Sequence, residues 1–482
     1  MLTANNNKKI TPRSQDFSAW YQDIIESADL AEHGPVKGTM IIKPYGYSMW
    51  ENIREVLDKR FKELGVENVY FPMFIPESFL KKEESHVEGF SPEVAVVTYA
   101  GGKKLQEALI VRPTSETIIY DAFSRWIGSH RDLPIIINQW VNVVRWELRP
   151  RLFLRTTEFL WQEGHTAHAT YEEADDMART MLNVYREFIE DYLAIPVIPG
   201  IKSESERFAG AMHTYTIEAM MQDGKALQLA TSHNLGQNFA KAFNITFNKE
   251  DSSSEYIWQT SWGLSTRTIG GFIMAHSDDK GLVIPPKIAP IHVVIVPIWS
   301  KDIDKEAVIN KAREIKNNLV NDLNLHVKVD ERDGLHPGEK YYYWEKRGIP
   351  VRLEIGPRDL KNESVILVRR DTGDKENVVF SLVNDRISAL LKDIQNNLFN
   401  KALKFRNEKT KEVSTWEDFV KEIENGNFVL AHWSGEASTE AEIKEKTKAT
   451  IRCIPFSKGE SEGKCILSGK PSNKRVIFAR FY

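Results

Sequence analysis

The stretch best suited to chemistry is residues 143–168, "VVRWELRPRLFLRTTEFLWQEGHTAH", where charged and aromatic residues recur at a spacing of two. Successive side chains of a β-strand point to opposite faces of its sheet, so Arg145 and Glu147 are expected on one face of a first strand. On a returning strand four side chains share a face: Phe159, Trp161, Glu163 and His165. Charges on a half-buried sheet are costly unless they line a pocket, so the pattern predicts a polar pocket on this sheet.

The alternative is a solvated face of salt bridges, which is the usual fate of mixed surface charges. The interleaved aromatic residues favour the pocket. Arginines are also concentrated in the connecting turn, which carries Arg149, Arg151 and Arg155. The planar guanidinium of arginine can bind phosphate at two points and stays charged.

Residues 143–168 resemble motif 2 of class II aminoacyl-tRNA synthetases, in its prolyl form. Other motifs of that family follow in the expected order. "ELGVENVYFPMFIP" resembles motif 1, whose proline, here Pro72, lies at the dimer interface in the family, and "SWGLSTRTIGGFIMAH" resembles motif 3. "RPTSET", "RFAG" and "QLATSHNLGQNFAKAF" resemble the segments that build the amino-acid pocket. The ordered set is far more specific than a lone Arg-x-Glu.

The resemblance implies a role for each matching position. Arg145 and Arg267 are expected to be the catalytic residues, because they hold the α- and γ-phosphates of ATP. ATP would be bound by Arg145, Glu147, Arg155, Thr156, Gln228, Thr231 and Arg267. L-Proline would be bound by Thr114, Glu116, Arg145, Trp161, Glu163, Phe208 and His233.

The expected reaction explains why cations dominate these sets. Attack of a carboxylate on the α-phosphate of ATP brings two anions together, so the site must supply fixed positive charge and hydrogen bonds. Neither a nucleophile nor a general base is expected. Mg²⁺ is expected on the ATP phosphates, with protein ligands that the spacing does not identify.

With 482 residues, the chain is long enough for two or three domains. The proline-rich "GLVIPPKIAP" predicts the first boundary. The predicted fold is a multidomain mixture of α+β and α/β. It comprises a class II catalytic domain on an antiparallel sheet (1–285), an α/β anticodon-binding domain with a mainly parallel sheet (286–407) and a small α+β C-terminal domain (408–482). In the anticodon-binding domain, the resemblance implies that Glu345 and Arg352 read the tRNA(Pro) anticodon. The phosphate contacts there would be Arg347, Arg358, Arg369 and Arg370.

Residues 463–475, "GKCILSGKPSNKR", invite two other interpretations. The spacing of Gly463 and Gly469 does not fit a phosphate-binding loop, and Pro471 replaces the Ser or Thr that such a loop needs. The related synthetases often carry a four-cysteine zinc site here, but this stretch retains only Cys465. A structural zinc site needs four good ligands, so no structural zinc is expected.

Composition narrows the class of protein. A net charge of −4 gives no overall attraction to nucleic acid, so a tRNA site must be a local patch. Two cysteines and the lack of a long apolar run predict a cytoplasmic protein with no membrane segment. A homodimer is expected from motif 1. About ninety residues separate motifs 2 and 3, which leaves no room for the editing insertion of the bacterial form and favours the archaeal and eukaryote-like form. In that form the terminal carboxylate, here of Tyr482, turns toward the active site.

Four alternatives remain to be weighed. A class II enzyme for threonine, serine, glycine or histidine would share the scaffold but not this set of motifs. A class I enzyme would need motifs that the sequence lacks. A non-catalytic paralogue would be expected to lose Arg145 or Arg267, and a purely structural protein would not explain charge in two buried motifs.

Overall fold

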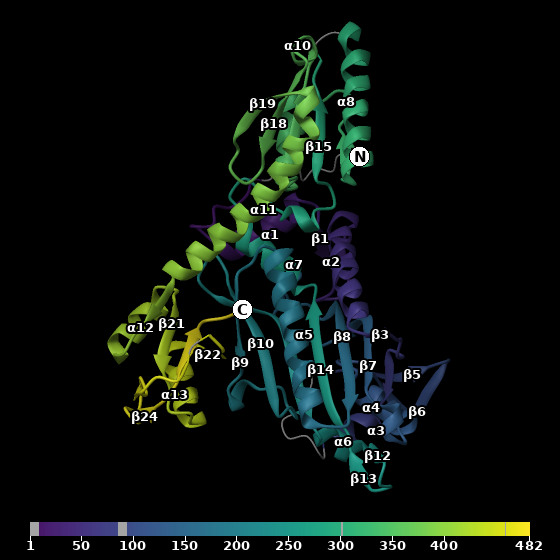
Figure 1. Cartoon of the computed structure of the whole chain (residues 1–482), viewed down its shortest axis with the longest axis vertical. Coiled ribbons are helices and arrows are strands. Elements are labelled where there is room, and N and C mark those ends of the chain that lie inside the picture. The colour runs from purple at the N-terminus through teal and green to yellow at the C-terminus, as the bar shows by residue number, and fades with distance from the viewer. Residues whose placement is uncertain (1–8, 85–93, 300–301, 458) are drawn as a thin grey trace.

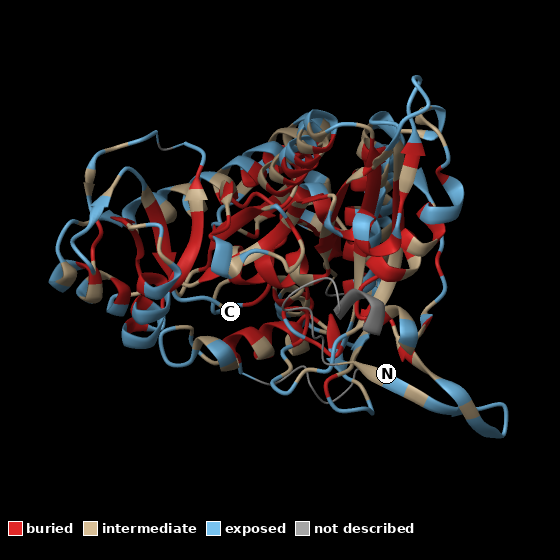
Figure 2. Cartoon of the chain, turned by 90° about the horizontal axis from the view of Figure 1, so that it is seen from below, coloured by how far each residue is buried: buried red, intermediate tan, exposed pale blue. Residues whose placement is uncertain are grey.

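The computed structural model describes residues 9–84, 94–299, 302–457 and 459–482. It shows three regions, with a large sheet in the middle, a smaller sheet domain at one end and a C-terminal unit at one side (Figure 1). Buried residues are concentrated in the sheets and in the helices that face them, whereas the connecting loops are exposed (Figure 2). Among the described residues, no helix has the length and apolar character needed to cross a membrane.

The large sheet carries the predicted active-site motifs. Its catalytic part has the strand order β9-β10-β11-β14-β8-β7-β3 and is antiparallel except for the short β3 beside β7. These strands are β3 (Glu67–Asn68), β7 (Ile135–Val144), β8 (Glu158–His168), β9 (Val197–Ile201), β10 (His213–Met220), β11 (Ala226–Gly236) and β14 (Trp258–Ser265). The antiparallel catalytic sheet predicted from the sequence is therefore correct.

Smaller elements surround this sheet. The additional strands are β1 (Ala31–His33), β2 (Met40–Ile42), β4 (Phe74–Pro76), β5 (Ala95–Ala100), β6 (Lys103–Val111), β12 (Thr246–Asn248) and β13 (Ser254–Tyr256). The helices are α1 (Phe17–Ser27), α2 (Pro44–Glu63), α3 (Glu77–Glu84), α4 (Glu116–Trp126), α5 (Tyr171–Asp191), α6 (Asn238–Phe243) and α7 (Arg267–His276).

Helix α5 covers one face of the catalytic sheet, so the site must lie on the opposite face. The N-cap of α5 is Thr170, whose side chain accepts a hydrogen bond from the Glu173 amide, at the spacing typical of a capping box. The apolar stripe of α5 packs on the sheet, and the Tyr185 hydroxyl donates to Gln162 of β8 (2.6 Å). Since strand side chains alternate, the odd-numbered residues of β8 point away from α5 toward the opposite face.

The second region is an α/β domain with strand order β16-β15-β17-β18-β19. The first three strands are parallel, whereas β18 and β19 are antiparallel to their neighbours, so the sheet is mixed rather than mainly parallel. The strands are β15 (Val293–Pro297), β16 (Val327–Val329), β17 (Val351–Ile355), β18 (Ser364–Arg369) and β19 (Lys375–Val379). The helices are α8 (Asp302–Leu323), α9 (Pro337–Lys346), α10 (Pro357–Lys361) and α11 (Val383–Glu408).

Helix α11 leads from this domain to the C-terminal unit (Figure 1). That unit contains β20 (Thr410–Glu412), α12 (Trp416–Glu424), β21 (Phe428–His432), α13 (Ala437–Thr447), β22 (Thr450–Pro455), β23 (Gly463–Lys464), β24 (Pro471–Ser472) and β25 (Arg475–Ala479). Its sheet, β20-β21-β25-β22, joins the catalytic sheet through pairing of β22 with β9, which makes eleven strands in all.

Candidate active site

A pocket of about 310 Å³ opens on the face of the catalytic sheet opposite α5. It collects predicted residues from separate motifs, namely Thr114, Glu116, Arg145, Trp161, Glu163, Phe208, Gln228, Thr231, His233 and Arg267. The sheet brings them together because β8, β14 and β11 are neighbours, so that His165, Ser261 and His233 lie in one row across the strands. The predicted pocket thus exists at the predicted place.

One end of the pocket is built around the buried carboxylate of Glu163. It accepts hydrogen bonds from Ser115 and from Gln139 Nε2 (2.8 Å), and His165 Nε2 lies 3.1 Å from its other oxygen. Burial alone would raise the pKa of Glu163, but hydrogen bonds from these three partners outweigh burial and lower it. Glu163 is therefore an oriented anion at neutral pH.

Apolar and polar groups alternate around this carboxylate. Thr114 donates a hydrogen bond to Glu116, which is also buried. The rings of Phe208 and His233 lie 4.7 Å apart, and His233 Nδ1 is 3.0 Å from the Thr214 hydroxyl. Burial, together with the charge of His165, lowers the pKa of His233 to about 3, so this imidazole is neutral at pH 7.

The other end of the pocket is cationic. The Arg145 guanidinium lies over the rings of Phe159 (5.6 Å) and Trp161 (5.3 Å), and its Nε donates to the Pro113 carbonyl (2.9 Å). The Arg267 Nε donates to the Leu154 carbonyl (3.2 Å). Hydrogen bonds to neutral carbonyl groups orient both guanidinium groups without neutralising their charge.

Three arginines converge at this end. Burial, together with the positive charges of Arg155 and Arg145, lowers the pKa of Arg267 to about 10. Arg267 remains charged at pH 7 at this value. Repulsion among these positive charges raises the free energy of the empty site, and a bound anion would relieve it. The cluster therefore suits a polyphosphate.

The loop between β7 and β8 differs from the prediction. Strand β7 ends at Val144, so Arg145 and Glu147 lie in the loop rather than on a strand face. The spacing of two between charged residues continues along the sequence past Val144, although β7 ends there. Beyond the strand, the Arg145 amide still donates a backbone hydrogen bond to the Thr157 carbonyl (2.8 Å). Glu147 Oε2 lies 3.4 Å from Arg155 Nε, and the Thr156 hydroxyl donates to the Glu158 carbonyl (2.7 Å). These three residues of the loop flank the pocket instead of lining it.

Several site residues were missed in the sequence. Ser115 and Gln139 bond to Glu163 and to each other (2.9 Å), and Ser261 lines the pocket with its buried hydroxyl unpartnered within the described chain. Gln139 could have been found, because a polar residue interrupts an apolar strand there. Ser115 lies inside the recognised "RPTSET" segment. Ser261 gives no comparable signal, since serine is ordinary at any strand position.

The remaining predicted residues lie away from the pocket. Pro72 is exposed between the exposed side chains of Tyr70 and Phe74. Glu345 is the last residue but one of α9, and Arg352 is the second residue of β17. The Arg352 guanidinium pairs with Glu354 (2.9 Å) and covers the Tyr341 ring (4.2 Å).

Three of the four arginines expected as phosphate contacts near Glu345 form ion pairs within the protein. Arg347 pairs with Asp29 (3.0 Å), Arg370 with Asp278 (2.7 Å) and Arg369 with Asp371 (2.8 Å). Arg358 lies in the short α10. The first two pairs therefore join the α/β domain to the catalytic domain.

Residues 463–475 form a small hairpin in which β23 pairs with β24. Cys465 is buried at its turn, and hydrogen bonds from Ser468 and nearby amides lower the pKa of its thiol against the effect of burial. Within the described ranges no three His, Cys, Asp or Glu residues are grouped as metal ligands. At the chain terminus, the Tyr482 hydroxyl donates to Asp223 (2.6 Å) and the ring lies under the Arg151 guanidinium.

Comparison with known proteins agrees with this architecture. Residues 99–276 match the family profile "tRNA synthetase class II core domain (G, H, P, S and T)", residues 292–390 match "Anticodon binding domain" and residues 416–482 match "Prolyl-tRNA synthetase, C-terminal". The chain is 55% identical to the proline–tRNA ligase of Porphyromonas gingivalis strain W83, covering 99% of this chain and 100% of that protein.

Other relatives are equally similar along their whole length. The proline–tRNA ligase of Chloroherpeton thalassium is 56% identical, covering 98% of this chain and 100% of that protein. The proline–tRNA ligase of Bacteroides fragilis is 53% identical over 99% and 100% of the two chains. The chain belongs to the prolyl-tRNA synthetase family of class II aminoacyl-tRNA synthetases.

Proposed function

We propose that this protein is a proline–tRNA ligase, which uses ATP to activate L-proline and transfers it to tRNA(Pro). In the first step the carboxylate oxygen of proline forms a bond to the α-phosphorus of ATP, and the bond to diphosphate breaks. In the second step a ribose hydroxyl of the tRNA terminus attacks the prolyl carbonyl, loses its proton, and releases AMP. The products are prolyl-tRNA, AMP and diphosphate.

The observation that carries the proposal is the cationic end of the pocket next to the carboxylate end. Arg145 lies between them, since it contacts Trp161 and Phe159 and also lowers the pKa of Arg267. We assign Arg145 to the α-phosphate and the prolyl carboxylate, and Arg267 to the γ-phosphate. Fixed charges placed where the transition state accumulates negative charge lower its free energy without reorganisation.

The other end suits proline. A secondary ammonium is attracted to the buried carboxylates of Glu116 and Glu163, while Trp161 and Phe208 offer flat apolar surfaces to the ring. We assign Thr114 and His233 to the same pocket, where neutral His233 adds no repulsion to the ammonium. Positioning alone contributes on the order of 7 kcal/mol or more in such a reaction.

The ATP site is completed by the flanking loop and by β11. We assign Gln228 and Thr231 to the ribose side, Glu147 to the adenine, and Arg155 and Thr156 to the closing loop. Mg²⁺ would be held mainly by the ATP phosphates, and no protein ligand is assigned.

Further assignments extend beyond the pocket. Glu345 and Arg352 would read the anticodon, because a carboxylate accepts from a base amino group and an arginine donates to guanine. Exposed Tyr70 and Phe74 beside Pro72 support a homodimer. The domain limits at residues 285 and 407, a cytoplasmic location and the lack of structural zinc remain predictions, the last of which elemental analysis tests directly.

Proline-dependent exchange between ATP and labelled diphosphate tests the first step. Wild-type protein should exchange with proline, and Arg145→Ala should abolish the exchange because the α-phosphate loses its counter-charge. Exchange with a different amino acid in place of proline contradicts the assignment. Glu345→Ala should lower tRNA charging far more than exchange, and equal losses would refute the separation of the two sites.

A further inference from the structure

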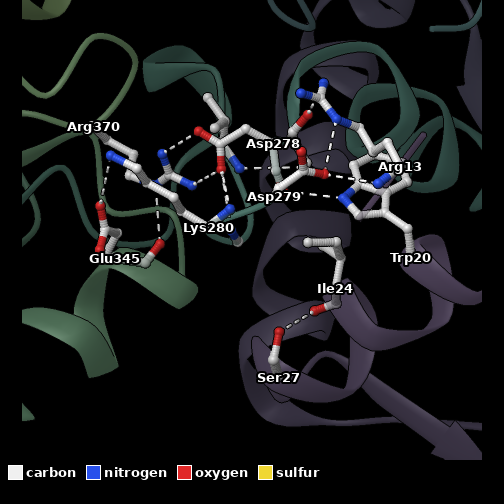
Figure 3. A network of polar contacts seen from close by, with 12 residues as sticks. Arg13, Trp20, Ile24, Ser27, Asp278, Asp279, Lys280, Glu345 and Arg370 are labelled. Atoms are coloured by element: carbon white, nitrogen blue, oxygen red, sulfur yellow. Dashed lines mark hydrogen bonds and ion pairs between the residues drawn. The ribbon is translucent and has the colours of Figure 1, made fainter. Parts of the chain in front are cut away.

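The loop that follows α7 reaches out of the catalytic domain and touches the end of α9 (Figure 3). The Leu282 amide donates to the Lys346 carbonyl (3.1 Å). A Cβ atom added to Gly281 would lie 2.6 Å from the Lys346 Cα, so the two backbones are in direct contact. The residue before Lys346 is Glu345, which the proposed function assigns to the anticodon.

A partly buried ion pair between Arg370 and Asp278 stabilises this contact. The two terminal nitrogens of Arg370 donate to the two carboxylate oxygens of Asp278 (2.8 and 2.7 Å). The third nitrogen, Arg370 Nε, donates to the backbone carbonyl of Glu345 (3.0 Å). The Arg370 side chain is 5% exposed, so a single guanidinium ties the catalytic domain to the backbone of Glu345.

The catalytic domain holds Asp278 in place independently of this pair. Trp20 Nε1 of α1 donates to the Asp278 carbonyl (3.1 Å). Next to it, the Arg13 amide and Nε donate to Asp279 (2.9 and 3.1 Å), a contact that stays within the catalytic domain. Asp278 and Asp279 are therefore adjacent carboxylates, of which only the first reaches across the domain contact with its side chain.

The Glu345 side chain itself remains accessible. It is 32% exposed, and it forms an ion pair with Lys280 Nζ at 4.0 Å, on a side chain that is 68% exposed. An exposed pair at this distance is weak and screened by water, so it does not occupy the carboxylate. The Glu345 backbone is thus hydrogen-bonded across the domain contact, while its carboxylate is left open to a ligand.

We infer that Asp278 and Arg370 are positioning residues for anticodon recognition, which set the place of Glu345 from the catalytic domain. This inference rests on the proposed function. A carboxylate that discriminates bases must be held within a fraction of an ångström, since hydrogen bonds weaken steeply with poor geometry. The pair supplies that precision by joining Asp278 of the catalytic domain to Arg370 within the anticodon-binding domain.

The test compares Asp278→Asn and Arg370→Lys with Asp279→Asn as the matched control. Asparagine keeps the size of Asp278 but loses its charge, and lysine keeps the charge of Arg370 but cannot make all three bonds. Three quantities are measured: proline-dependent exchange, kcat and KM for tRNA(Pro), and the preference for tRNA(Pro) over a transcript with one anticodon guanine replaced. Thermal unfolding shows whether each variant is folded at the assay temperature.

Asp278→Asn and Arg370→Lys are expected to leave exchange unchanged and to raise KM for tRNA(Pro) on the order of tenfold. They should also reduce the preference for the correct anticodon, which looser packing alone would not do. Asp279→Asn should match wild type.

An unchanged anticodon preference in folded Asp278→Asn or Arg370→Lys overturns the inference, and so does an equal effect of Asp279→Asn. Lack of proline-dependent exchange in the wild type would instead contradict the proposed function.

Discussion

The role proposed for Arg267 depends on the planar shape of its guanidinium group as well as on its charge. This residue is oriented by a carbonyl, lies near Arg145 and Arg155, and starts α7, where backbone amides also favour an anion. Positive charge is therefore concentrated at the position that the proposed function assigns to the terminal phosphate of ATP.

Arg267→Lys keeps the positive charge but removes the planar fork. We expect kcat/KM for ATP to fall on the order of a hundredfold, because a lysine grips phosphate at one point only. Exchange measured over a range of ATP concentrations gives this value. Arg131→Lys, on the turn before β7, is the control and should behave as wild type, whereas an equally active Arg267→Lys would contradict the assigned role.

At the scale of elements, the pocket depends on the close packing of β8 against β14. Gly164 lies opposite Trp262 across these strands, and a Cβ atom at Gly164 would meet the Trp262 ring at 2.1 Å. The ring cannot move freely because Phe61 and Tyr185 belong to the same core.

Gly164→Ala should therefore destabilise the protein by about 1–3 kcal/mol through overpacking. Urea unfolding measures the loss, and Gly338→Ala is the control because its added Cβ meets nothing within 4 Å. A stable Gly164→Ala variant would mean that β14 can move away from β8 without cost.

Local patterns predicted the elements that local forces determine. Thr170 and Glu173, followed by an apolar stripe at helical spacing, are local signals that suffice to predict α5. Strand alternation correctly grouped Trp161, Glu163 and His165. The end of β7 at Val144 was not predictable, because alternation continues into the loop and only the partner strand stops pairing. Antiparallel β18 and β19 and the union of β22 with β9 were also missed, since strand pairing over long separations leaves no periodic signal.

For the whole molecule, buried histidines predict how stability changes with pH. Burial lowers the pKa of His168 and of His276 to about 4, from 6.5. As pH falls below about 6.5, the unfolded chain binds protons at these positions and the folded chain does not, so stability decreases. The loss continues until about pH 4, where the folded protein also binds them.

Each histidine should contribute about 1.4 kcal/mol per pH unit within this window. Urea unfolding between pH 6 and pH 4.5 measures the slope, and His276→Gln should make it shallower by that amount. An unaltered slope in this variant would show that His276 does not stay neutral in the folded protein.

The pairing of β22 with β9 also bears on solubility. Strand β9 is hydrogen-bonded to β10 on one side, and Ile454 and Pro455 of β22 cover Ile201 and Gly200 on the other. Without residues beyond α11, part of β9 would present unpaired amide and carbonyl groups. Such an exposed strand edge can pair with strands of other molecules and cause aggregation. The C-terminal unit therefore acts as a protective border for the catalytic sheet, and its loss would threaten colloidal stability before it altered the chemistry.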